Sequence, residues 1–217
     1  MSARRLPTLL DAHRAALAAC RQCGHDDMRV LPIISEARRP RAMLVGQAPG
    51  KSELTDRRAF TGRAGRTLFR WLARAGLDEG AFRREVYIAA ITRCYPGPSP
   101  AGRGDRVPSL EEQVRCAPWL DAELDLIRPA LLIPVGRLAI DRFLGREPLD
   151  RLVGREHASV VRGRATSVIP LPHPSGASSW FNVPANRALL DRAIEHLRKA
   201  FDTLELHATA RAGRRTA

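Results

Sequence analysis

The sequence predicts an α/β protein in which helices cover both faces of a parallel β-sheet. Short apolar runs that end in Gly or Pro alternate along the chain with segments of helical periodicity, as is typical of parallel sheets. Hydrophobic residues make up 44% of the 217 residues, which is enough to form a buried core. We expect residues 1–205 to form one domain and residues 206–217 to be a basic flexible tail.

The first half of the chain is expected to contain two helices and two strands. The apolar residues of the segment 9–20 lie on one side of a helix, and Ala42–Gly46 is a short buried strand. Residues 65–75 are amphipathic and end at Gly76, which predicts the second helix. Residues 85–91 form the second strand.

The second half of the chain continues the alternation. Ser109 and Glu112 form a capping box that opens a helix reaching to about residue 127. The later elements are a strand over 130–135, a helix over Arg137–Leu144, an edge strand at 160–161, a strand over 167–171 and a helix over 186–201. Ligands bind at the carboxyl ends of parallel strands. The loops to search therefore follow residues 45, 91, 135 and 171.

The charge balance indicates a polyanionic partner. Lys and Arg outnumber Asp and Glu by 36 to 23, which gives a net charge of +13, and 34 of the basic residues are arginine. Clustered guanidinium groups bind a phosphate backbone by releasing its counterions, so nucleic acid is the favoured partner. An anionic membrane surface, or solubility alone, would also fit the charge. No run of about 18 apolar residues is present to span a membrane.

Three loops carry residues suited to binding and catalysis. The residues of the first loop, which let bare backbone approach a ligand closely, are Gly46, Gln47, Ala48, Pro49 and Gly50. Phe60 lies between small residues before a helix and can stack on a planar base. His173 lies between two prolines and can donate a hydrogen bond to a substrate oxygen on which negative charge develops. Each has a structural alternative: a tight turn, a core phenylalanine and a structural histidine.

Four cysteines form a further candidate site. Cys20 and Cys23 form a C-x-x-C pair, Cys94 follows the second strand, and Cys116 lies in the capped helix. The N-terminus lacks the features of a secretory signal, so we expect a bacterial, cytoplasmic, nucleoid-associated protein without disulfides. A metal centre with four thiolate ligands and four unrelated buried cysteines are both compatible with the spacing.

The joint order of these pieces resembles the uracil-DNA glycosylase superfamily, most closely its iron–sulfur families 4 and 5. The matching motifs are Leu-Val-Gly-Gln-Ala-Pro-Gly at 44–50, Phe-Thr-Gly-Arg-Ala-Gly at 60–65, Val-Tyr-Ile-Ala-Ala-Ile-Thr-Arg-Cys-Tyr-Pro at 86–96, Glu-Gln-Val-Arg-Cys-Ala-Pro-Trp-Leu at 112–120 and His-Pro-Ser at 173–175. The resemblance covers roughly residues 20–201. It implies a three-layer α/β sandwich with a central four-stranded parallel sheet flanked by helices.

The resemblance also implies a cofactor and a role for each motif. It implies a [4Fe-4S] cluster that braces DNA-binding loops and is bound by Cys20, Cys23, Cys94 and Cys116. Phe60 would stack on the extruded base, while residues 46–50 and Ala90 would shape the pocket for the base and a water. His173 would face the base oxygen, with Gln47 as its catalytic partner at the water. Ser175 would press on the DNA backbone.

Three positions depart from the family patterns. Family 4 has a glutamate where this chain has Gln47, and an amide can orient water but cannot accept its proton. Family 5 has an aspartate where this chain has Arg63. The asparagine that reads uracil in family 4 falls on Ala90. The carboxylates nearest to Gln47 in sequence are Glu53 and Asp56, and the sequence does not place either of them at the water.

Two functions from different classes follow from these observations. The first is a monofunctional glycosylase that acts as a monomer on DNA containing deaminated bases, with uracil first and hypoxanthine or xanthine as further candidates. The second is a DNA-binding relative that is catalytically weak or inactive and that senses or protects damaged DNA. A zinc protein that binds RNA is a third alternative.

Overall fold

A single mixed sheet forms the centre of the molecule. The computed structural model describes residues 6–23, 30–100, 102, 104–175 and 179–206, and within them five strands pair in the order β2-β1-β3-β5-β4. The strands are β1 (Ala42–Gly46), β2 (Val86–Ala90), β3 (Leu131–Pro134), β4 (His157–Val161) and β5 (Arg164–Val168). The first three and β5 run parallel, whereas β4 pairs antiparallel with β5 at the edge. The predicted α/β class is confirmed, with five strands in the sheet rather than four.

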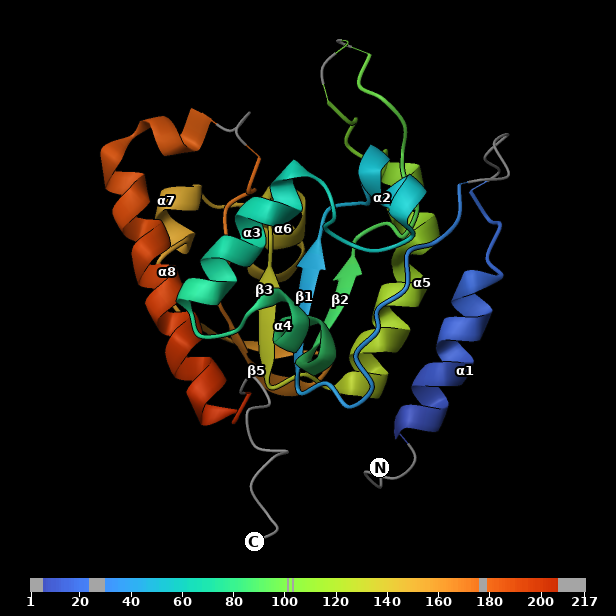
Figure 1. The fold of residues 1–217 in the computed structure, drawn as a ribbon, viewed down its shortest axis with the longest axis horizontal. Coiled ribbons are helices and arrows are strands. Elements are labelled where there is room, and N and C mark those ends of the chain that lie inside the picture. Colours follow the sequence, from blue (N-terminus) through green and yellow to red (C-terminus); the bar gives the residue numbers. More distant parts are fainter. Residues whose placement is uncertain (1–5, 24–29, 101, 103, 176–178, 207–217) are drawn as a thin grey trace, which may run out of the picture.

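Helices cover both faces of the sheet (Figure 1). The first face is covered by α3 (Arg63–Arg74), α4 (Glu79–Glu85) and α8 (Pro184–Thr203). The second face is covered by α1 (Leu6–Ala18), α5 (Leu110–Ile127) and α6 (Arg137–Leu144). Leu44 belongs to the first core, whereas its neighbours Met43 and Val45 belong to the second. Because successive residues of β1 face opposite layers and both layers are apolar, the strand reads as one continuous apolar run.

Short helices account for most of what the sequence does not predict. These are α2 (Lys51–Asp56), α4 and α7 (Leu149–Leu152), of four to seven residues each. A helix of one or two turns shows too little periodicity to be recognised from its apolar residues. The N-cap of α4 is nevertheless a readable signal, since the side chain of Asp78 accepts a hydrogen bond from the backbone N–H of Ala81 at 2.8 Å.

The strand predicted over residues 167–171 begins and ends earlier than expected. The continuous ladder of β5 ends at Val168, and beyond it only an isolated bridge joins Leu171 to Val135. The N–H groups of Ile169 and Leu171 still donate to β3, at the carbonyls of Leu132 and Pro134, but Pro134 has no N–H to donate in return, which explains the break in the ladder. The predicted edge strand at 160–161 is the last part of β4. The predicted tail lies outside the described residues, except for Leu206.

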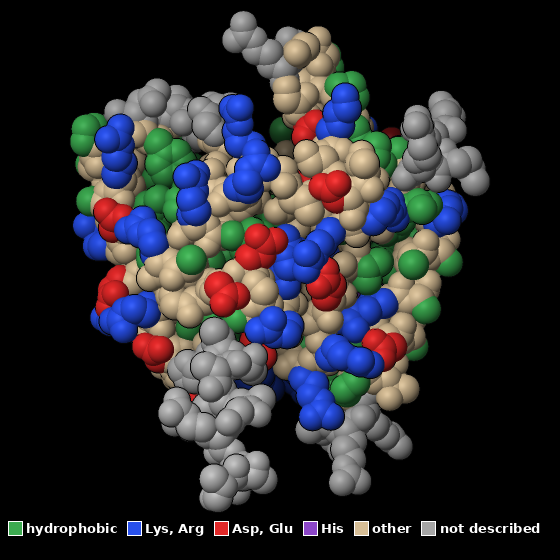
Figure 2. All heavy atoms as spheres, in the orientation of Figure 1, with side chains coloured by type: hydrophobic (Ala, Val, Ile, Leu, Met, Phe, Trp, Pro, Cys, Tyr) green, Lys and Arg blue, Asp and Glu red, His purple; other side chains and the backbone are tan. Residues whose placement is uncertain are grey.

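The surface carries basic and acidic side chains side by side. Figure 2 shows Lys and Arg spread over most of one face, with Asp and Glu set among them. Many of these arginines form ion pairs, such as Arg58 with Glu36 and Arg162 with Asp125. No helix in the described part of the chain is long and apolar enough to cross a membrane.

Candidate active site

The predicted loops meet at the carboxyl edge of the sheet, at the upper end of the strands in Figure 1. Gly46, the last residue of β1, is in register with Ala90, the last residue of β2. The Gly46 carbonyl then accepts a hydrogen bond from the N–H of Ile91 at 3.0 Å, and that of Gln47 from the N–H of Thr92 at 3.2 Å. These bonds extend the sheet by one step and fix where the first loop begins.

A pocket of about 370 Å³ opens beside the end of β1. It is lined by Ile33, Gly46, Ala48, Pro49, Glu53, Ala59, Phe60, Ile88, Ala89, Ala90 and Arg93. Five of the predicted base-pocket residues are therefore together, namely Gly46, Ala48, Pro49, Phe60 and Ala90. The predicted residues Gln47, Gly50, His173 and Ser175 do not line it. The wall formed by β2 is apolar.

The Phe60 ring lies directly against the end of β1. A Cβ built on Gly46 would lie 3.0 Å from Cζ of the Phe60 ring, so a side chain there would require the ring to move back by a few tenths of an ångström. Phe60 itself has a left-handed backbone with φ of 57°, which is rare for a bulky residue. A Cβ on Gly65 would lie 1.8 Å from the Phe60 carbonyl oxygen, which explains why the following helix needs glycine at this position.

Glu53 connects the two loops of the pocket. Its side chain is 8% exposed, and Oε2 accepts a hydrogen bond from the N–H of Gly50 at 2.8 Å. Oε1 accepts from the N–H of Thr61 at 3.0 Å and of Gly62 at 3.3 Å. Both oxygens are thus occupied by backbone donors, which makes Glu53 a clasp between the loop 46–50 and the loop that carries Phe60.

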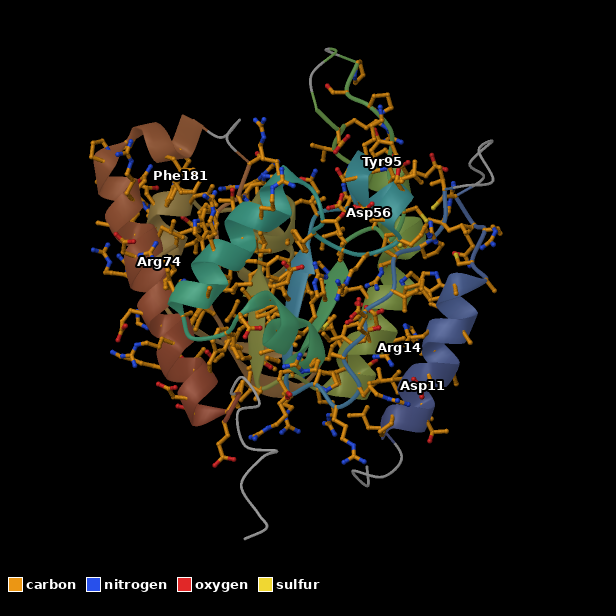
Figure 3. The ribbon with its side chains drawn as sticks, in the orientation of Figure 1. Asp11, Arg14, Asp56, Arg74, Tyr95 and Phe181 are labelled. Atoms are coloured by element: carbon orange, nitrogen blue, oxygen red, sulfur yellow. The ribbon has the colours of Figure 1, made fainter. Side chains whose placement is uncertain are left out.

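Of the two carboxylates near Gln47 in sequence, Glu53 alone reaches the pocket. Asp56 is exposed on α2, where Figure 3 shows it at the carboxyl edge of the sheet. The sequence signal for Glu53 is its position three residues after Gly50, where a capping glutamate reaches back to the helix N-terminus. Its second pair of hydrogen bonds, to the loop after Phe60, has no local signal.

His173 follows β5 in the chain, and its ring lies beside the end of β3, the strand that neighbours β1. A Cβ built on Gly136, which follows β3, would lie 3.1 Å from Cδ2 of the imidazole. The backbone N–H of Ser175 donates to Nδ1 of His173 at 3.2 Å, and Oγ of Ser175 lies 2.9 Å from the same nitrogen. Nδ1 is therefore the acceptor, and the neutral ring carries its proton on Nε2. Burial lowers the pKa of His173 below its ordinary value of 6.5, so the ring is neutral at pH 7.

The Phe60 ring and the imidazole occupy the ends of adjacent strands. β1 and β3 are direct neighbours in the sheet, and neighbouring strands lie about 4.8 Å apart. Pro174 and Ser175 face a second, open groove of about 840 Å³ whose walls include Trp71, in α3, and Phe181. His173 itself lines neither the base pocket nor this groove.

A buried arginine forms the inner wall of the pocket. Nη1 of Arg93 donates to Oε2 of Glu123 at 2.9 Å, and Nη2 donates to the carbonyl of Ile33 at 3.0 Å. Arg93 also accepts, through its carbonyl, a hydrogen bond from the N–H of Ile33 at 2.9 Å. The other carboxylate oxygen of Glu123 accepts from the hydroxyl of Tyr87 at 2.8 Å. Burial, and next Glu123, raise the pKa of Tyr87, so it stays a donor.

The sequence analysis does not identify Arg93 and Glu123. A signal exists for both: an arginine directly after a buried strand, and a glutamate among the apolar positions of the helix that Ser109 caps. Both side chains are buried, with relative exposures of 2% and 0%, and a buried charge requires a partner. These signals indicate that each charge needs a buried partner, but no local pattern pairs the two residues with each other.

The four cysteines come from three parts of the chain: Cys20 and Cys23 follow α1, Cys94 follows β2, and Cys116 lies in α5. Burial, followed by the thiols of Cys23, Cys116 and Cys20, raises the pKa of Cys94 to about 12. Burial likewise raises the pKa of Cys116 to about 11, although a backbone hydrogen bond from Arg93 acts in the opposite direction. None of the four is in a disulfide. In the described residues, no three His, Cys, Asp or Glu side chains are arranged so as to hold a metal ion.

Comparison with known proteins identifies the family. A family model described as the uracil DNA glycosylase superfamily matches residues 34–198, so the chain belongs to this superfamily, as its motifs predict. A type-4 uracil-DNA glycosylase of Sulfurisphaera tokodaii is 30% identical over 131 residues, which is 59% of this chain and 54% of the relative. One of Thermotoga maritima is 33% identical over 104 residues, 48% of this chain and 49% of the relative.

A relative of the other type matches a longer part of the chain. A type-5 uracil-DNA glycosylase of Pyrobaculum aerophilum is 32% identical over 174 residues, which is 74% of this chain and 70% of the relative. In contrast, the chain spans only about half the length of the type-4 relatives that it matches.

Replacing Glu53 by glutamine tests the clasp. The amide turns one acceptor oxygen into an N–H donor that faces backbone N–H groups, which leaves at least one buried donor unpaired. We expect the free energy of unfolding, measured by urea titration, to fall by about 2 kcal/mol. Asp56→Asn, the matched change at an exposed carboxylate of the same helix, should alter it by less than about 0.5 kcal/mol. Equal effects of the two substitutions would contradict the clasp.

Proposed function

We propose that the protein is a monofunctional DNA glycosylase that swings a deaminated base out of DNA and hydrolyses its N-glycosidic bond. The observation that carries this proposal is the placement of Phe60 and His173 at adjacent strand ends. The first offers a ring beside an apolar pocket, and the second offers a half-buried, neutral imidazole with a proton on Nε2. The names of the type-4 and type-5 relatives support the same reaction.

The chemistry requires a donor for the departing base. When the bond between the sugar C1′ and the base nitrogen breaks, its electron pair stays on the base, and negative charge develops on a base oxygen. Nε2–H of His173 would donate to that oxygen and stabilise the charge. One such donor lowers the activation barrier by about 3–4 kcal/mol. Water then bonds to C1′ and releases a proton to solvent.

The water is assigned to Gln47 in this proposal. Its amide can orient a water molecule, although it cannot take up a proton. Glu53 is the one carboxylate that lines the pocket among the described residues, and backbone N–H groups occupy both of its oxygens. We therefore assign Glu53 a positioning role, and we expect the leaving-group interaction with His173 to carry most of the rate.

The apolar wall of the pocket supports a broad choice of base. Ile88, Ala89 and Ala90 line it from β2, and none of these side chains can hydrogen-bond to the edge of a pyrimidine. The choice of base would then depend on the shape of the pocket and on the hydrogen bond from His173. We propose uracil as the first substrate, with hypoxanthine and xanthine as further candidates, in DNA bound by a single copy of the protein.

We further propose that Cys20, Cys23, Cys94 and Cys116 hold a [4Fe-4S] cluster. The chemistry of the donor set fits this group, because all four thiols are free and Cys94 lies close enough to Cys23, Cys116 and Cys20 for each of them to raise its pKa, although the described side chains do not converge on one point. When bound, the cluster would supply a covalent tie between α1, the end of β2 and α5. Arg93 would connect this tie to the pocket, since its guanidinium and its carbonyl both bond to Ile33.

The alternative is a DNA-binding relative with little or no catalysis. Two observations favour it. Gln47 does not line the pocket. Both carboxylate oxygens of Glu53 accept hydrogen bonds from backbone N–H groups, so no carboxylate among the described residues that line the pocket is free. Such a protein would bind damaged DNA without releasing a base. The experiments below separate the two functions.

Base release from defined oligonucleotides tests the enzymatic function. Purified protein should produce abasic sites in DNA containing uracil, measured under single-turnover conditions, and His173→Ala should lower the rate about 100- to 1,000-fold. Hypoxanthine and xanthine oligonucleotides define the range of bases. If the wild-type protein releases none of the three bases faster than His173→Ala while still binding the DNA, the alternative function holds.

The pH dependence tests the protonation state of His173. Because burial lowers its pKa below 6.5, the active neutral ring is fully populated at pH 7 and above. We expect the single-turnover rate to stay nearly constant from pH 7 to 8.5. The rate should fall as the pH drops below 6.5 and the ring becomes protonated. A rate that declines steadily as pH rises through 6.5 would show that the imidazolium is the active form instead.

Replacing Cys94 by serine tests the cluster. The wild-type protein, purified without oxygen, should be brown and should contain four iron and four sulfide ions per chain, as the formula [4Fe-4S] requires. Cys94→Ser should lose most of both and should unfold more easily, because the tie between α1, β2 and α5 is weakened. Colourless wild-type protein loaded with zinc would contradict the cluster.

A further inference from the structure

Helix α3 carries a row of arginines on its outer side. Arg63, Arg66, Arg70 and Arg74 are spaced by three, four and four residues, which places them on one face of a helix. All four are exposed, whereas the opposite face of α3 is buried through Leu68, Phe69, Trp71 and Leu72. With a rise of 1.5 Å per residue, the row extends about 16 Å along the helix axis.

Three of these arginines differ from many others on the surface in having no acidic partner. Exposed arginines elsewhere are held by carboxylates, as Arg142 is by Asp121 at 2.9 Å and Arg198 by Glu195 at 2.6 Å. Within α3, Arg74 is paired with Asp191 at 2.6 Å. In the described part of the chain, Arg63 and Arg66 have no hydrogen-bond or ion-pair partner for their side chains, and Arg70 has only the hydroxyl of Thr67.

The row begins at the base pocket and continues along the open groove. Arg63 is the third residue after Phe60, at the carboxyl edge of the sheet. Thr67, Trp71 and Arg74 of α3 line the groove of about 840 Å³, whose opposite wall includes Ser175 of the histidine loop and Phe181. Figure 3 shows Arg74 and Phe181 on the side of the molecule where α3 packs against α8. A path of positive charge thus leaves the pocket beside a space wide enough for a nucleotide.

We propose that Arg63, Arg66 and Arg70 form a track for the phosphates of the DNA strand that carries the flipped base. This inference rests on the proposed function and adds the direction in which the strand leaves the pocket, along α3 rather than across the opposite layer of helices. Unpaired guanidinium groups release counterions from phosphates without first breaking an ion pair, so these three contribute more to binding than paired arginines do.

The test is the salt dependence of DNA binding by the triple variant Arg63→Gln, Arg66→Gln, Arg70→Gln. Binding of a single-stranded uracil oligonucleotide is measured by fluorescence anisotropy between 50 and 200 mM salt, with base release followed in parallel. Each lost phosphate contact should lower the slope of log affinity against log salt by about 0.7, or about 2 in all. The ratio of the wild-type affinity to that of the triple variant should then fall about 20-fold between 50 and 200 mM salt.

A matched control removes three positive charges from the opposite end of the sheet. Arg39 and Arg128 are exposed and precede β1 and β3, Arg164 is exposed and is the first residue of β5, and the triple glutamine variant of the three has the same net charge as the α3 variant. It should keep the wild-type slope. Equal slopes for the two triple variants would overturn the track, because net charge alone would then explain the binding.

Base release separates this inference from the proposed function. At saturating protein, the control variant should release uracil at the wild-type single-turnover rate, since its three arginines lie at the opposite end of the sheet from the pocket. A wild-type protein that releases no base refutes the glycosylase, while the salt slopes still decide the track. An α3 variant that keeps the wild-type slope but loses base release also overturns the track. Circular dichroism melting confirms that both variants are folded.

Discussion

The close approach of the Phe60 ring to Gly46 is the constraint on which the site depends. A side chain at position 46 would push the ring away from the end of β1 by a few tenths of an ångström, and the Phe60 backbone turns there in the left-handed region. That conformation is costly for a bulky residue and persists because neighbouring contacts impose it. Glu53 provides them by bonding to Thr61 and Gly62 on one side and to Gly50 on the other. The pocket is the space that this arrangement leaves.

A second, buried interaction connects that pocket to the cysteines. Arg93 and Glu123 form an ion pair that is almost wholly buried, and Ile33, Tyr87 and His13 supply further hydrogen-bond partners to the two side chains. Replacing such a pair by apolar residues is often neutral, whereas removing one partner is strongly destabilising. The pair therefore adds little net stability, but it fixes Ile33 in the pocket wall relative to Cys94 and Cys116. A change at the cysteines would reach the pocket by this route.

The sequence predicts those parts of the molecule that local chemistry determines. Apolar runs identify β1, β2 and β3, and the rule that ligands gather at carboxyl ends brings Gly46, Ala48, Pro49, Phe60 and Ala90 to one pocket. The antiparallel strand β4 was read only at its end, because its exposure alternates and it lacks the continuous apolar run of a buried strand. The clasp by Glu53 depends on residues eight and nine positions away, and the Arg93 pair joins residues 30 apart. No local pattern encodes such contacts.

The departures from the family patterns acquire a common explanation in this geometry. A carboxylate at position 47 would stabilise positive charge on the sugar, while the histidine stabilises negative charge on the base, and this chain retains only the second element. Its imidazole is half-buried, neutral and fixed in one tautomer by Ser175. A donor that is already oriented loses little in reorganisation when charge develops on the leaving group. Bases that form more stable anions depend less on a carboxylate near the sugar. In the proposed reaction, the lack of a carboxylate at position 47 should therefore restrict the substrates to bases that are good leaving groups. The apolar wall at Ala90 acts in the other direction, because it would accept bases of different shapes.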